Sequence, residues 1–252
     1  MAEKTPALKF TKMHALGNDF VVLDAITQEV QITPEHAKKI AHRNAGIGCD
    51  QILIVEPPSD PNVDFKYRIF NQDGSEVSQC GNGARCFAKY VRDRRLTGKK
   101  LIKVETSAGV LELRADANHS YSVAMGIPNF IAGHIPYAGA DASEELLSSN
   151  SLDDQTTSQD FFTLSIGNPH AVLLVDSVET AEVERLGKLF QAHADFPESV
   201  NVGFMQVVSS SEIKLRVYER GAGETLACGS GACAAVVAGI NNNLLDLSLI
   251  HI

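Results

Sequence analysis

The sequence repeats itself in two stretches, FKYRIFNQDGSEVSQCGNGA (residues 65–84) and IKLRVYERGAGETLACGSGA (residues 213–232). The second stretch follows the first by 148 positions, and seven of the twenty aligned residues are identical. A further echo, LGNDFVVL (16–23) and IGNPHAVL (166–173), occurs in the same order at an offset of 150. Two echoes with nearly equal offsets indicate an internal duplication, so we expect two similar halves that face each other across a cleft.

The repeated stretches also predict the local structure of each half. Residues 65–70 and 213–218 alternate and carry aromatic or β-branched side chains, which is typical of strands. A turn containing Gly follows each strand, and helices are expected to open at CGNGARC and CGSGAC. Residues 101–115 predict a hairpin around Ala108-Gly109. The fold class is therefore α+β, with two pseudo-symmetric domains in which a mostly antiparallel sheet wraps around or against a helix.

The repeat sets the expected domain boundaries. We expect an N-terminal half at 8–132, an acidic and Ser-rich connection or insertion at 133–160, and a C-terminal half at 161–252. Strands expected at 101–127 would have their equivalents at 249–275, but the sequence stops at 252. The tail after about Asn243 is therefore expected to be truncated or replaced, lacking about 25 residues by this repeat arithmetic.

Composition narrows the class of protein. The chain has 252 residues, 44% of them hydrophobic, which is enough for a substantial core. Its 22 Lys and Arg against 31 Asp and Glu give a net charge of -9, so no nucleic-acid partner is expected. No stretch is apolar enough to span a bilayer, and the start MAEKTPALKF has no secretory signal. A cytoplasmic protein without a membrane partner is expected.

The five cysteines are more informative than their number. An odd count without a secretory signal argues against a disulfide framework, and neither close pair has the CxxC spacing of a zinc site. We therefore expect no metal. Cys49, Cys86 and Cys233 are interpreted as small buried hydrophobic residues. Cys80 and Cys228 differ because each precedes a Gly-rich helix start.

A cysteine at such a helix start suits acid–base chemistry. The first N–H groups of a helix lack intrahelical partners and carry partial positive charge, so they bind an anion and are expected to lower a nearby thiol pKa. If the duplicated halves face each other, Cys80 and Cys228 would lie on opposite sides of one ligand. One thiolate would remove an α-proton, and the other thiol would deliver a proton to the opposite face, which inverts a stereocentre.

Polar residues near the two cysteines also recur in the repeat. Asn18 and Asn168 occupy equivalent places, as do Asn71 and Glu219. Arg220 beside Glu219 suits a second carboxylate and amine, because an Arg fork can grip a carboxylate. His170 and Glu219 are candidates for tuning a thiol. Together with Asn201, these residues predict a ring of contacts around an amino-acid ligand.

The motifs FTKMHALGNDFVVLD, GIGCDQILIV, FNQDGSEVSQCGNGARC, IGNPHAV, VNVGF and YERGAGETLACGSGAC together resemble the diaminopimelate epimerase family, over about Lys9 to about Asn243. The resemblance implies cofactor-independent interconversion of LL- and meso-2,6-diaminopimelate by two cysteines, in lysine and peptidoglycan precursor synthesis. It also implies two domains, each a β-barrel around a central helix, with the active site between them. A homodimer is implied as well.

The resemblance assigns roles to residues by matching motif. Cys80 and Cys228 would be the acid–base pair, and His170 and Glu219 would modulate them. The reacting carboxylate would lie on the two helix starts, at Gly81, Asn82, Gly229 and Ser230. The rest of the substrate would be recognised by Asn18, Gln51, Asn71, Asn168, Asn201, Glu219 and Arg220.

Two alternatives remain at this point. A proline or hydroxyproline racemase-like enzyme of the same fold would share the paired cysteines, but a single ring-sized amino acid would leave Asn71, Asn201 and Arg220 without a distal partner. A thiol redox or binding protein could instead join Cys80 and Cys228 reversibly. The substitution Asn71→Ala distinguishes these hypotheses, because it should impair only an epimerase that needs the Asn71 amide.

Overall fold

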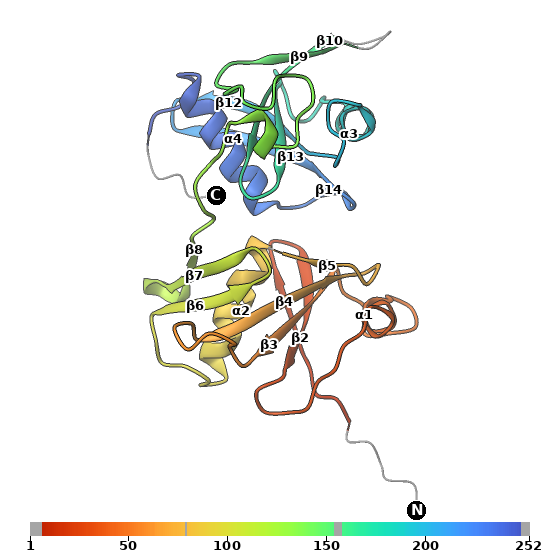
Figure 1. Ribbon diagram of the computed structural model, residues 1–252, viewed down its shortest axis with the longest axis vertical. Helices are drawn as coiled ribbons and strands as arrows, with labels where there is room; N and C mark the ends of the chain where they lie inside the picture. The colour runs from red at the N-terminus through yellow and green to blue at the C-terminus, as the bar shows by residue number, and fades with distance from the viewer. Residues whose placement is uncertain (1–6, 79, 154–157, 248–252) are drawn as a thin grey trace, which may run out of the picture. The chain divides into compact units, whose positions relative to one another are not determined.

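The computed structural model describes residues 7–78, 80–153 and 158–247. The chain divides into two compact units, Met1–Ala124 and Met125–Ile252 (Figure 1). Each unit consists of one sheet with a helix on each of its two faces, which confirms the expected α+β class.

The first unit contains an eight-stranded sheet in the order β1-β2-β3-β4-β6-β7-β8, with β5 paired to β4. Its strands are β1 (Thr11–Ala15), β2 (Asn18–Asp24), β3 (Gln51–Glu56), β4 (Phe65–Asn71), β5 (Glu76–Val77), β6 (Leu101–Thr106), β7 (Gly109–Ala115) and β8 (Tyr121–Val123). Its helices are α1 (Pro34–Ala41), α2 (Gly81–Asp93) and the short 3-10 helix η1 (Ala117–His119). The hairpin expected around Ala108-Gly109 is the β6–β7 pair.

The first sheet is curled, since α2 contacts both β1 and β8 at its opposite edges. All its pairings are antiparallel except β2–β3 and β4–β6. Side chains alternate between the two faces. Phe20, Leu53 and Ile69 pack with α2, and this side is called the α2 face. Val21 and Ile52 pack with α1, and this side is called the α1 face.

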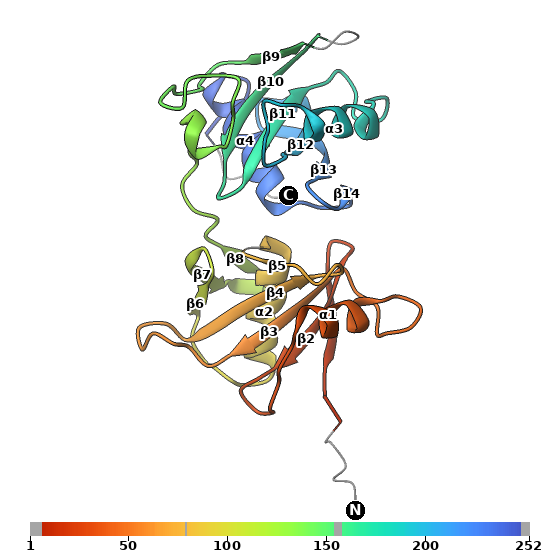
Figure 2. The same ribbon diagram turned by 45° about the vertical axis from the view of Figure 1, so that its right-hand side comes forward.

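The second unit repeats this frame with a six-stranded sheet in the order β14-β13-β12-β11-β10-β9 (Figure 2). Its strands are β9 (Asn150–Asp153), β10 (Ser158–Ser165), β11 (Pro169–Leu174), β12 (Asn201–Ser209), β13 (Glu212–Glu219) and β14 (Gly223–Thr225). Its helices are η2 (Ala132–His134), α3 (Val183–Ala192) and α4 (Gly229–Asn241). Helix α4 contacts β10 to β13, and α3 contacts β12 to β14.

The strand register supports the duplication inferred from the sequence. In the first unit Phe20 is paired with Gln51 across the parallel β2–β3 pair. In the second unit His170 is paired with Asn201 across the parallel β11–β12 pair. Both pairs are related by the offset of 150, so equivalent residues can be compared position by position.

The unit boundary differs from the expected one. The division falls at Ala124/Met125, eight residues before the expected end at 132, because Asn129 exchanges backbone hydrogen bonds of 2.9 and 2.8 Å with Ser165 of β10. The segment expected as a solvated connection at 133–160 belongs to the second unit. Its Leu146 and Leu152 are buried in that core, and β9 pairs with β10. Residues 154–157 of that segment lie outside the described residues.

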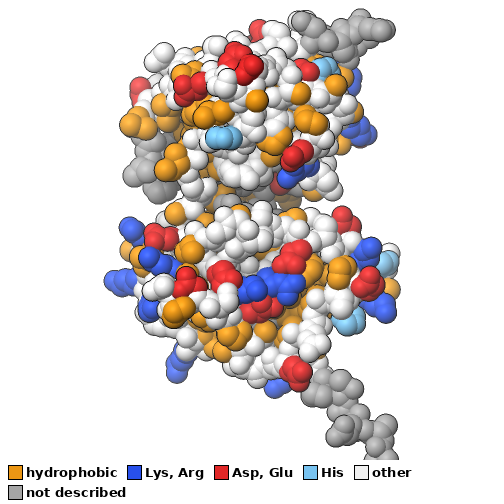
Figure 3. All heavy atoms as spheres, in the orientation of Figure 1, with side chains coloured by type: hydrophobic (Ala, Val, Ile, Leu, Met, Phe, Trp, Pro, Cys, Tyr) orange, Lys and Arg blue, Asp and Glu red, His pale blue; other side chains and the backbone are white. Residues whose placement is uncertain are grey.

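The described chain ends at Leu247, shortly after α4, and the last five residues of the tail expected to be truncated or replaced lie outside it. Leu245 is buried and packs against α4 at Gly239. Within the described residues, none of the helices is long and apolar enough to cross a membrane. Acidic and basic side chains are intermixed over the face of the first unit shown in Figure 3.

Candidate active site

Cys80 and Cys228 occupy the same structural position in the two units. Each is the N-cap residue of its helix, α2 for Cys80 and α4 for Cys228. The Sγ of Cys80 accepts a hydrogen bond of 3.4 Å from the N–H of Gly83, and the Sγ of Cys228 accepts one of 3.4 Å from Gly231. Sulfur therefore fills the role usually taken by a Ser, Thr or Asp oxygen, which places each thiol against the positive end of a helix.

Glycine is required behind the thiol of the first unit. A Cβ on Gly83 would lie 2.4 Å from the buried hydroxyl of Tyr67, which is much too close for an ordinary contact. The glycine of Cys-Gly-x-Gly therefore lets α2 begin directly on β4. Asn82, predicted to help bind the carboxylate, is 3% exposed and accepts a hydrogen bond from Arg85.

In the second unit the structure joins most of the predicted residues into a connected chain of contacts. Ser230 Oγ lies 3.6 Å from Cys228 Sγ, and Asn168 Nδ2 donates to Ser230 Oγ at 3.5 Å. The Nε2 of His170 lies 3.0 Å from Asn168 Oδ1. His170 thus reaches Cys228 through two intervening side chains.

Glu219 forms the other branch of this chain. Its carboxylate accepts a hydrogen bond from Thr225 Oγ1, and its negative charge acts on the Cys228 thiol. Burial, and secondarily the negative charge of Glu219, raise the pKa of Cys228 to about 12. Burial also raises the pKa of Glu219. A partly buried thiol and a partly buried carboxyl therefore act on each other, and the pKa values of both move in favour of the protonated form.

This corrects the expectation that the helix start lowers the thiol pKa of Cys228. The N-terminal position of α4 does favour the thiolate, and the hydrogen bonds from Gly231 and Ser230 act in that direction. Desolvation and the adjacent carboxylate outweigh them. Cys228 is thus a thiol until its proton is transferred.

His170 is 1% exposed, and burial lowers its pKa to about 3, with a smaller contribution in the same direction from the positive charge of Arg220. The imidazole is therefore neutral at pH 7. Asn201 is fixed by its backbone neighbours, because its Nδ2 donates to the carbonyl of Pro169 at 3.1 Å and its Oδ1 accepts from the N–H of Arg220 at 2.9 Å.

In the first unit three predicted contact residues, Asn18, Gln51 and Asn71, lie at one end of three adjacent strands and are called the amide trio. The register pairs Gln51 with Asn71, and Gln51 Nε2 donates to Asn71 Oδ1 at 2.9 Å. Alternation along the strands places all three on the α2 face, the side of the sheet on which α2 packs behind Cys80. The Oδ1 of Asn18 and the Oε1 of Gln51 are buried and have no hydrogen-bond partner.

These unpaired oxygens have chemical meaning. A buried acceptor without a donor costs free energy, so such groups are normally paired. Two carboxamide oxygens at one place form a site for a ligand that brings N–H donors, such as an ammonium group. The remaining predicted residues, Gly81, Gly229 and Ser230, lie in the first turns of the two helices.

Sequence reasoning missed two features. Thr225 bonds Glu219, and a charged network on the α1 face lies behind the amide trio. Strand alternation was the available signal for the network, because Asp19 follows Asn18 and Asp50 precedes Gln51. Of the cysteines interpreted as buried hydrophobic residues, Cys49 and Cys86 are buried, and Cys233 is partly exposed.

Comparison with known proteins identifies the family of this chain. Residues 10–131 and 162–248 match the model of the family described as diaminopimelate epimerase. The chain belongs to the diaminopimelate epimerase family. It is 56% identical to a diaminopimelate epimerase of Thioalkalivibrio sulfidiphilus over 95% of this chain and 85% of that protein. It is 52% identical to one of Pseudomonas syringae pv. tomato over 96% and 87%. These relatives confirm the resemblance read from the motifs, and the family is one of isomerases.

Solved structures show the same fold at low identity. A probable proline racemase from Agrobacterium radiobacter superposes with a TM-score of 0.68 at 14% identity, over 96% of this chain and 80% of that one. A hydroxyproline epimerase from Agrobacterium vitis gives 0.65 at 14% identity, over 94% and 78%. This likeness confirms the fold class. Against more than 50% identity to diaminopimelate epimerases, it does not favour the proline racemase alternative.

Proposed function

We propose that this protein interconverts LL- and meso-2,6-diaminopimelate without a cofactor, using Cys80 and Cys228 as its acid–base pair. The observation that carries the proposal is the matched N-cap position of the two cysteines, in a chain of the diaminopimelate epimerase family. Each thiol lies at a helix N-terminus, where N–H groups and the helix dipole favour an anionic substrate group. The product would serve lysine and peptidoglycan precursor synthesis.

The proposed reaction consists of three proton transfers. Cys228 first gives its proton to Glu219, which accepts it because burial has raised the carboxyl pKa. The resulting thiolate removes the α-proton of the substrate, and the electron pair is delocalised into the carboxylate. The thiol of Cys80 then delivers its proton to the opposite face of the same carbon. For the reverse direction the two cysteines exchange roles.

Binding of the reacting end is assigned to the helix starts. The carboxylate gains negative charge in the planar intermediate, and helix N–H groups at Gly81, Asn82, Gly229 and Ser230 would stabilise it there. Each such donor can contribute roughly 3 to 4 kcal/mol of barrier reduction. The proposal requires one helix start to serve each side of the reacting carbon.

The other end of the substrate is proposed to be recognised by amides and one ion-pair partner. The unpaired oxygens of Asn18 and Gln51 suit its ammonium group, and Arg220 suits its carboxylate. The full set proposed for this end is Asn18, Gln51, Asn71, Asn168, Asn201, Glu219 and Arg220. His170, neutral and buried, is proposed to hold Asn168 and Ser230 in place beside Cys228.

The test compares substrates without added cofactor. Reduced protein is incubated separately with LL-2,6-diaminopimelate, L-proline and trans-4-hydroxy-L-proline, and the stereoisomers are separated by chiral chromatography. The proposal predicts the meso isomer from diaminopimelate and no inversion of either proline. Inversion of a proline with no change in diaminopimelate would establish the racemase alternative instead.

We also propose that the protein is a homodimer and acts in the cytoplasm, as the family resemblance implies. Light scattering after size-exclusion chromatography tests the first point. A mass near twice 27.1 kDa supports a dimer, and a mass near 27.1 kDa contradicts it.

A further inference from the structure

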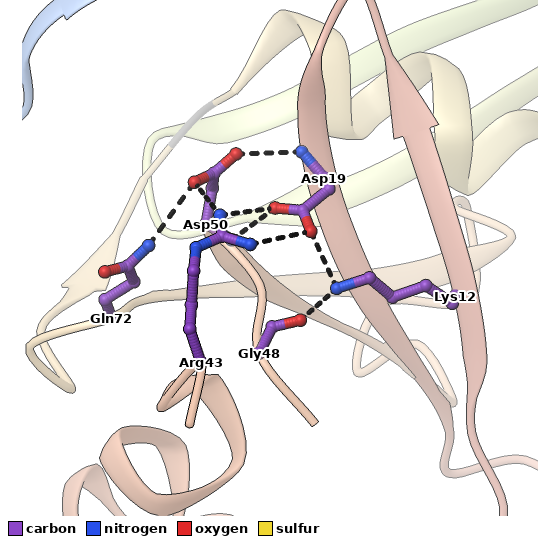
Figure 4. Close-up of polar contacts among 6 residues, drawn as sticks. All are labelled: Lys12, Asp19, Arg43, Gly48, Asp50 and Gln72. Carbon is purple, nitrogen blue, oxygen red and sulfur yellow. Dashed lines mark hydrogen bonds and ion pairs between the residues drawn. The ribbon is translucent and has the colours of Figure 1, made fainter. Parts of the chain in front are cut away.

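A charged network lies on the α1 face of the first sheet, where Figure 4 shows its contacts. It consists of Lys12, Asp19, Arg43, Asp50 and Gln72. Lys12 comes from β1, Asp19 from β2, and Arg43 from the turn that follows α1. Asp50 immediately precedes β3, and Gln72 immediately follows β4. Five separate pieces of the chain therefore meet at this point.

The two aspartates hold each other's backbone. The N–H of Asp19 donates to Asp50 Oδ2 at 2.9 Å, and the N–H of Asp50 donates to Asp19 Oδ1 at 2.9 Å. The N–H of Asp50 also lies 3.0 Å from the carbonyl of Asp19. This reciprocal arrangement fixes the relative position of the first residues of β2 and β3. The amide trio lies at the same end of these strands.

Arg43 keeps the two carboxylates together. Its guanidinium forms a fork on Asp19, with Nη2 at 2.9 Å from Oδ1 and Nη1 at 3.2 Å from Oδ2, and Nη2 also lies 2.6 Å from Asp50 Oδ1. Lys12 Nζ lies 2.7 Å from Asp19 Oδ2. Partial burial by itself would raise the pKa of Asp19, but hydrogen bonds from Arg43 and Lys12 hold it well below its ordinary value. Asp19 is therefore charged, and Arg43 holds the Asp50 side chain against it.

Each member of the amide trio is the sequence neighbour of a member of this network. Asn18 adjoins Asp19, Gln51 adjoins Asp50, and Asn71 adjoins Gln72. Neighbouring residues of a strand point to opposite faces, so the network and the trio share backbone but not surface. Moving one network residue shifts the backbone that carries a trio amide.

The second unit shows that the fold does not need such a network. At the offset of 150, Pro169 and Val200 replace Asp19 and Asp50, and both are buried. The parallel strand pair forms there all the same. Its amide Asn201 is instead held directly by the backbone of Pro169 and Arg220, whereas Asn18 Oδ1 and Gln51 Oε1 have no such partner.

We propose that Arg43 is a positioning residue for substrate recognition: by holding Asp19 to Asp50, it sets the spacing of the amide trio around the non-reacting end of the substrate. The inference rests on the proposed function, which assigns the trio to that end. Arg43 touches neither substrate nor cysteine in this account. Precise placement of recognition groups depends on such supporting residues, and displacements well below 1 Å matter.

A matched control exists on the same sheet. Arg68 of β4 also bridges two carboxylates, with Nε 2.7 Å from Glu76 Oε1 and Nη1 3.2 Å from Glu56 Oε1. Its side chain is less exposed than that of Arg43, at 27% against 53%. Arg68→Gln therefore removes a comparable ion-pair network on the α1 face, but one not adjacent to the trio.

The experiment measures KM and kcat for LL-2,6-diaminopimelate, with thermal melting, in wild type, Arg43→Gln, Arg43→Lys and Arg68→Gln. The proposal predicts that Arg43→Gln raises KM about tenfold or more while kcat changes much less. Arg43→Lys, which keeps the charge but loses the fork, should lie between wild type and Arg43→Gln. Arg68→Gln should leave KM within about twofold of wild type, because the trio is untouched.

An unchanged KM in Arg43→Gln, or an equal rise in Arg43→Gln and Arg68→Gln, would overturn the proposal. A second readout needs no substrate, so it separates this inference from the proposed function. The side-chain amide signals of Gln51 and Asn71 in ¹H–¹⁵N NMR spectra should move in Arg43→Gln and stay in place in Arg68→Gln. If wild type does not convert diaminopimelate, the proposed function fails, and the NMR comparison still decides whether Arg43 sets the trio.

Discussion

The two units build the same frame and place different groups around its cysteine. Where the first unit has Phe20 and Asn71, the second has His170 and Glu219 at equivalent positions. The first unit thus has an apolar side chain and a neutral amide at these two positions. The second has two titratable groups there: Glu219, whose charge acts on Cys228, and His170, which reaches Cys228 through Asn168 and Ser230. Duplication has preserved the helix-capping thiol and left the surrounding positions free to diverge.

The difference continues behind each site. In the first unit a network of charged residues on the α1 face ties together the strand ends that carry the amides. In the second unit the same strand positions hold Pro169 and Val200, and the site amides are held by hydrogen bonds within the site itself. The first unit therefore supports its site amides by ion pairs on the opposite face of the sheet. The second unit supports them by hydrogen bonds to the site residues themselves.

The largest effect is expected from removing either cysteine, because the proposed mechanism takes one acid–base group from each unit. Cys80→Ala and Cys228→Ala should each lower epimerisation of LL-2,6-diaminopimelate by about 10²–10⁴-fold, the usual range for a positioned proton-transfer group. Cys86→Ala, in the core on the same helix as Cys80, should retain activity. A chiral assay of the meso product measures all three. Full activity in either active-site variant would show that only one thiol is needed.

The next comparison exchanges a charged group of the second unit for the kind found in the first. Glu219→Gln removes the negative charge that raises the Cys228 pKa, so alkylation of Cys228 by iodoacetamide at pH 8 should become faster. Epimerisation should nevertheless fall by about 10²-fold, because the acceptor for the thiol proton is lost. A variant that alkylates faster and also epimerises faster would contradict the role given to Glu219.

His170 offers a comparison based on stability. Burial, and secondarily Arg220, holds its pKa at about 3, whereas an unfolded chain has about 6.5. Between these values the unfolded state binds a proton that the folded state excludes. The free energy of unfolding should therefore fall as the pH falls below 6.5, by up to about 1.4 kcal/mol per pH unit.

His170→Phe gives the second unit the residue found in the first and should remove this contribution. Urea unfolding at pH 7 and pH 4.5 measures the change in both proteins. His14→Phe is the control, because His14 is exposed and no buried imidazole is removed. An equal loss of stability in wild type and His170→Phe would show that His170 is not the source.

The smallest effects are expected from changes in the packing of α1 and α3 on their sheets. Ala37 of α1 lies on the sheet where Gly187 of α3 lies in the second unit, again at the offset of 150. A Cβ on Gly187 would lie 2.3 Å from Cγ of the Tyr218 ring. Gly187→Ala should therefore destabilise by about 1–3 kcal/mol despite the higher helix propensity of Ala.

The reverse exchange, Ala37→Gly, should cost about 1 kcal/mol from helix propensity and the lost methyl group. Urea titration of both variants tests the pair. Both exchanges should lower the free energy of unfolding. Stabilisation by Gly187→Ala would mean that α3 has more room over β13 than the structure shows.

Much of the fold could be predicted from the sequence, because each copy of the repeat supports the strand and helix predicted from the other. Two copies of strand, turn and Cys-Gly-x-Gly predicted that β4 is followed by α2 and that β13 is followed by α4. The hairpin predicted at 101–115 was also confirmed. The segment at 133–160 was harder, because its acidic and Ser-rich composition hides Leu146 and Leu152. Both are buried in the second core. Composition averages over a segment, whereas one or two apolar anchors decide whether it packs.

The electrostatics could not be predicted in the same way. A helix start lowers a thiol pKa when solvent is near, but the sequence does not show that Cys228 is desolvated and lies against Glu219. Likewise the pairing of Arg43 with Asp19 and Asp50 depends on the turn after α1, which brings Arg43 to the first residues of β2 and β3. No local sequence pattern specifies this. The motifs were enough to choose candidate residues, whereas the directions of their pKa shifts required the fold.

The most direct test of the central claim, that a thiol from each unit serves one carbon, is isotopic. Reduced protein and LL-2,6-diaminopimelate are mixed in D₂O without cofactor, and substrate and product are analysed by mass spectrometry at low conversion. The account predicts that the meso product carries deuterium at the inverted carbon while the remaining LL substrate is largely unlabelled. The delivering thiol has exchanged with solvent, and the removed proton stays on the other cysteine. A meso product that retains the original hydrogen would mean that a single group moves the proton between faces, which contradicts the two-cysteine account.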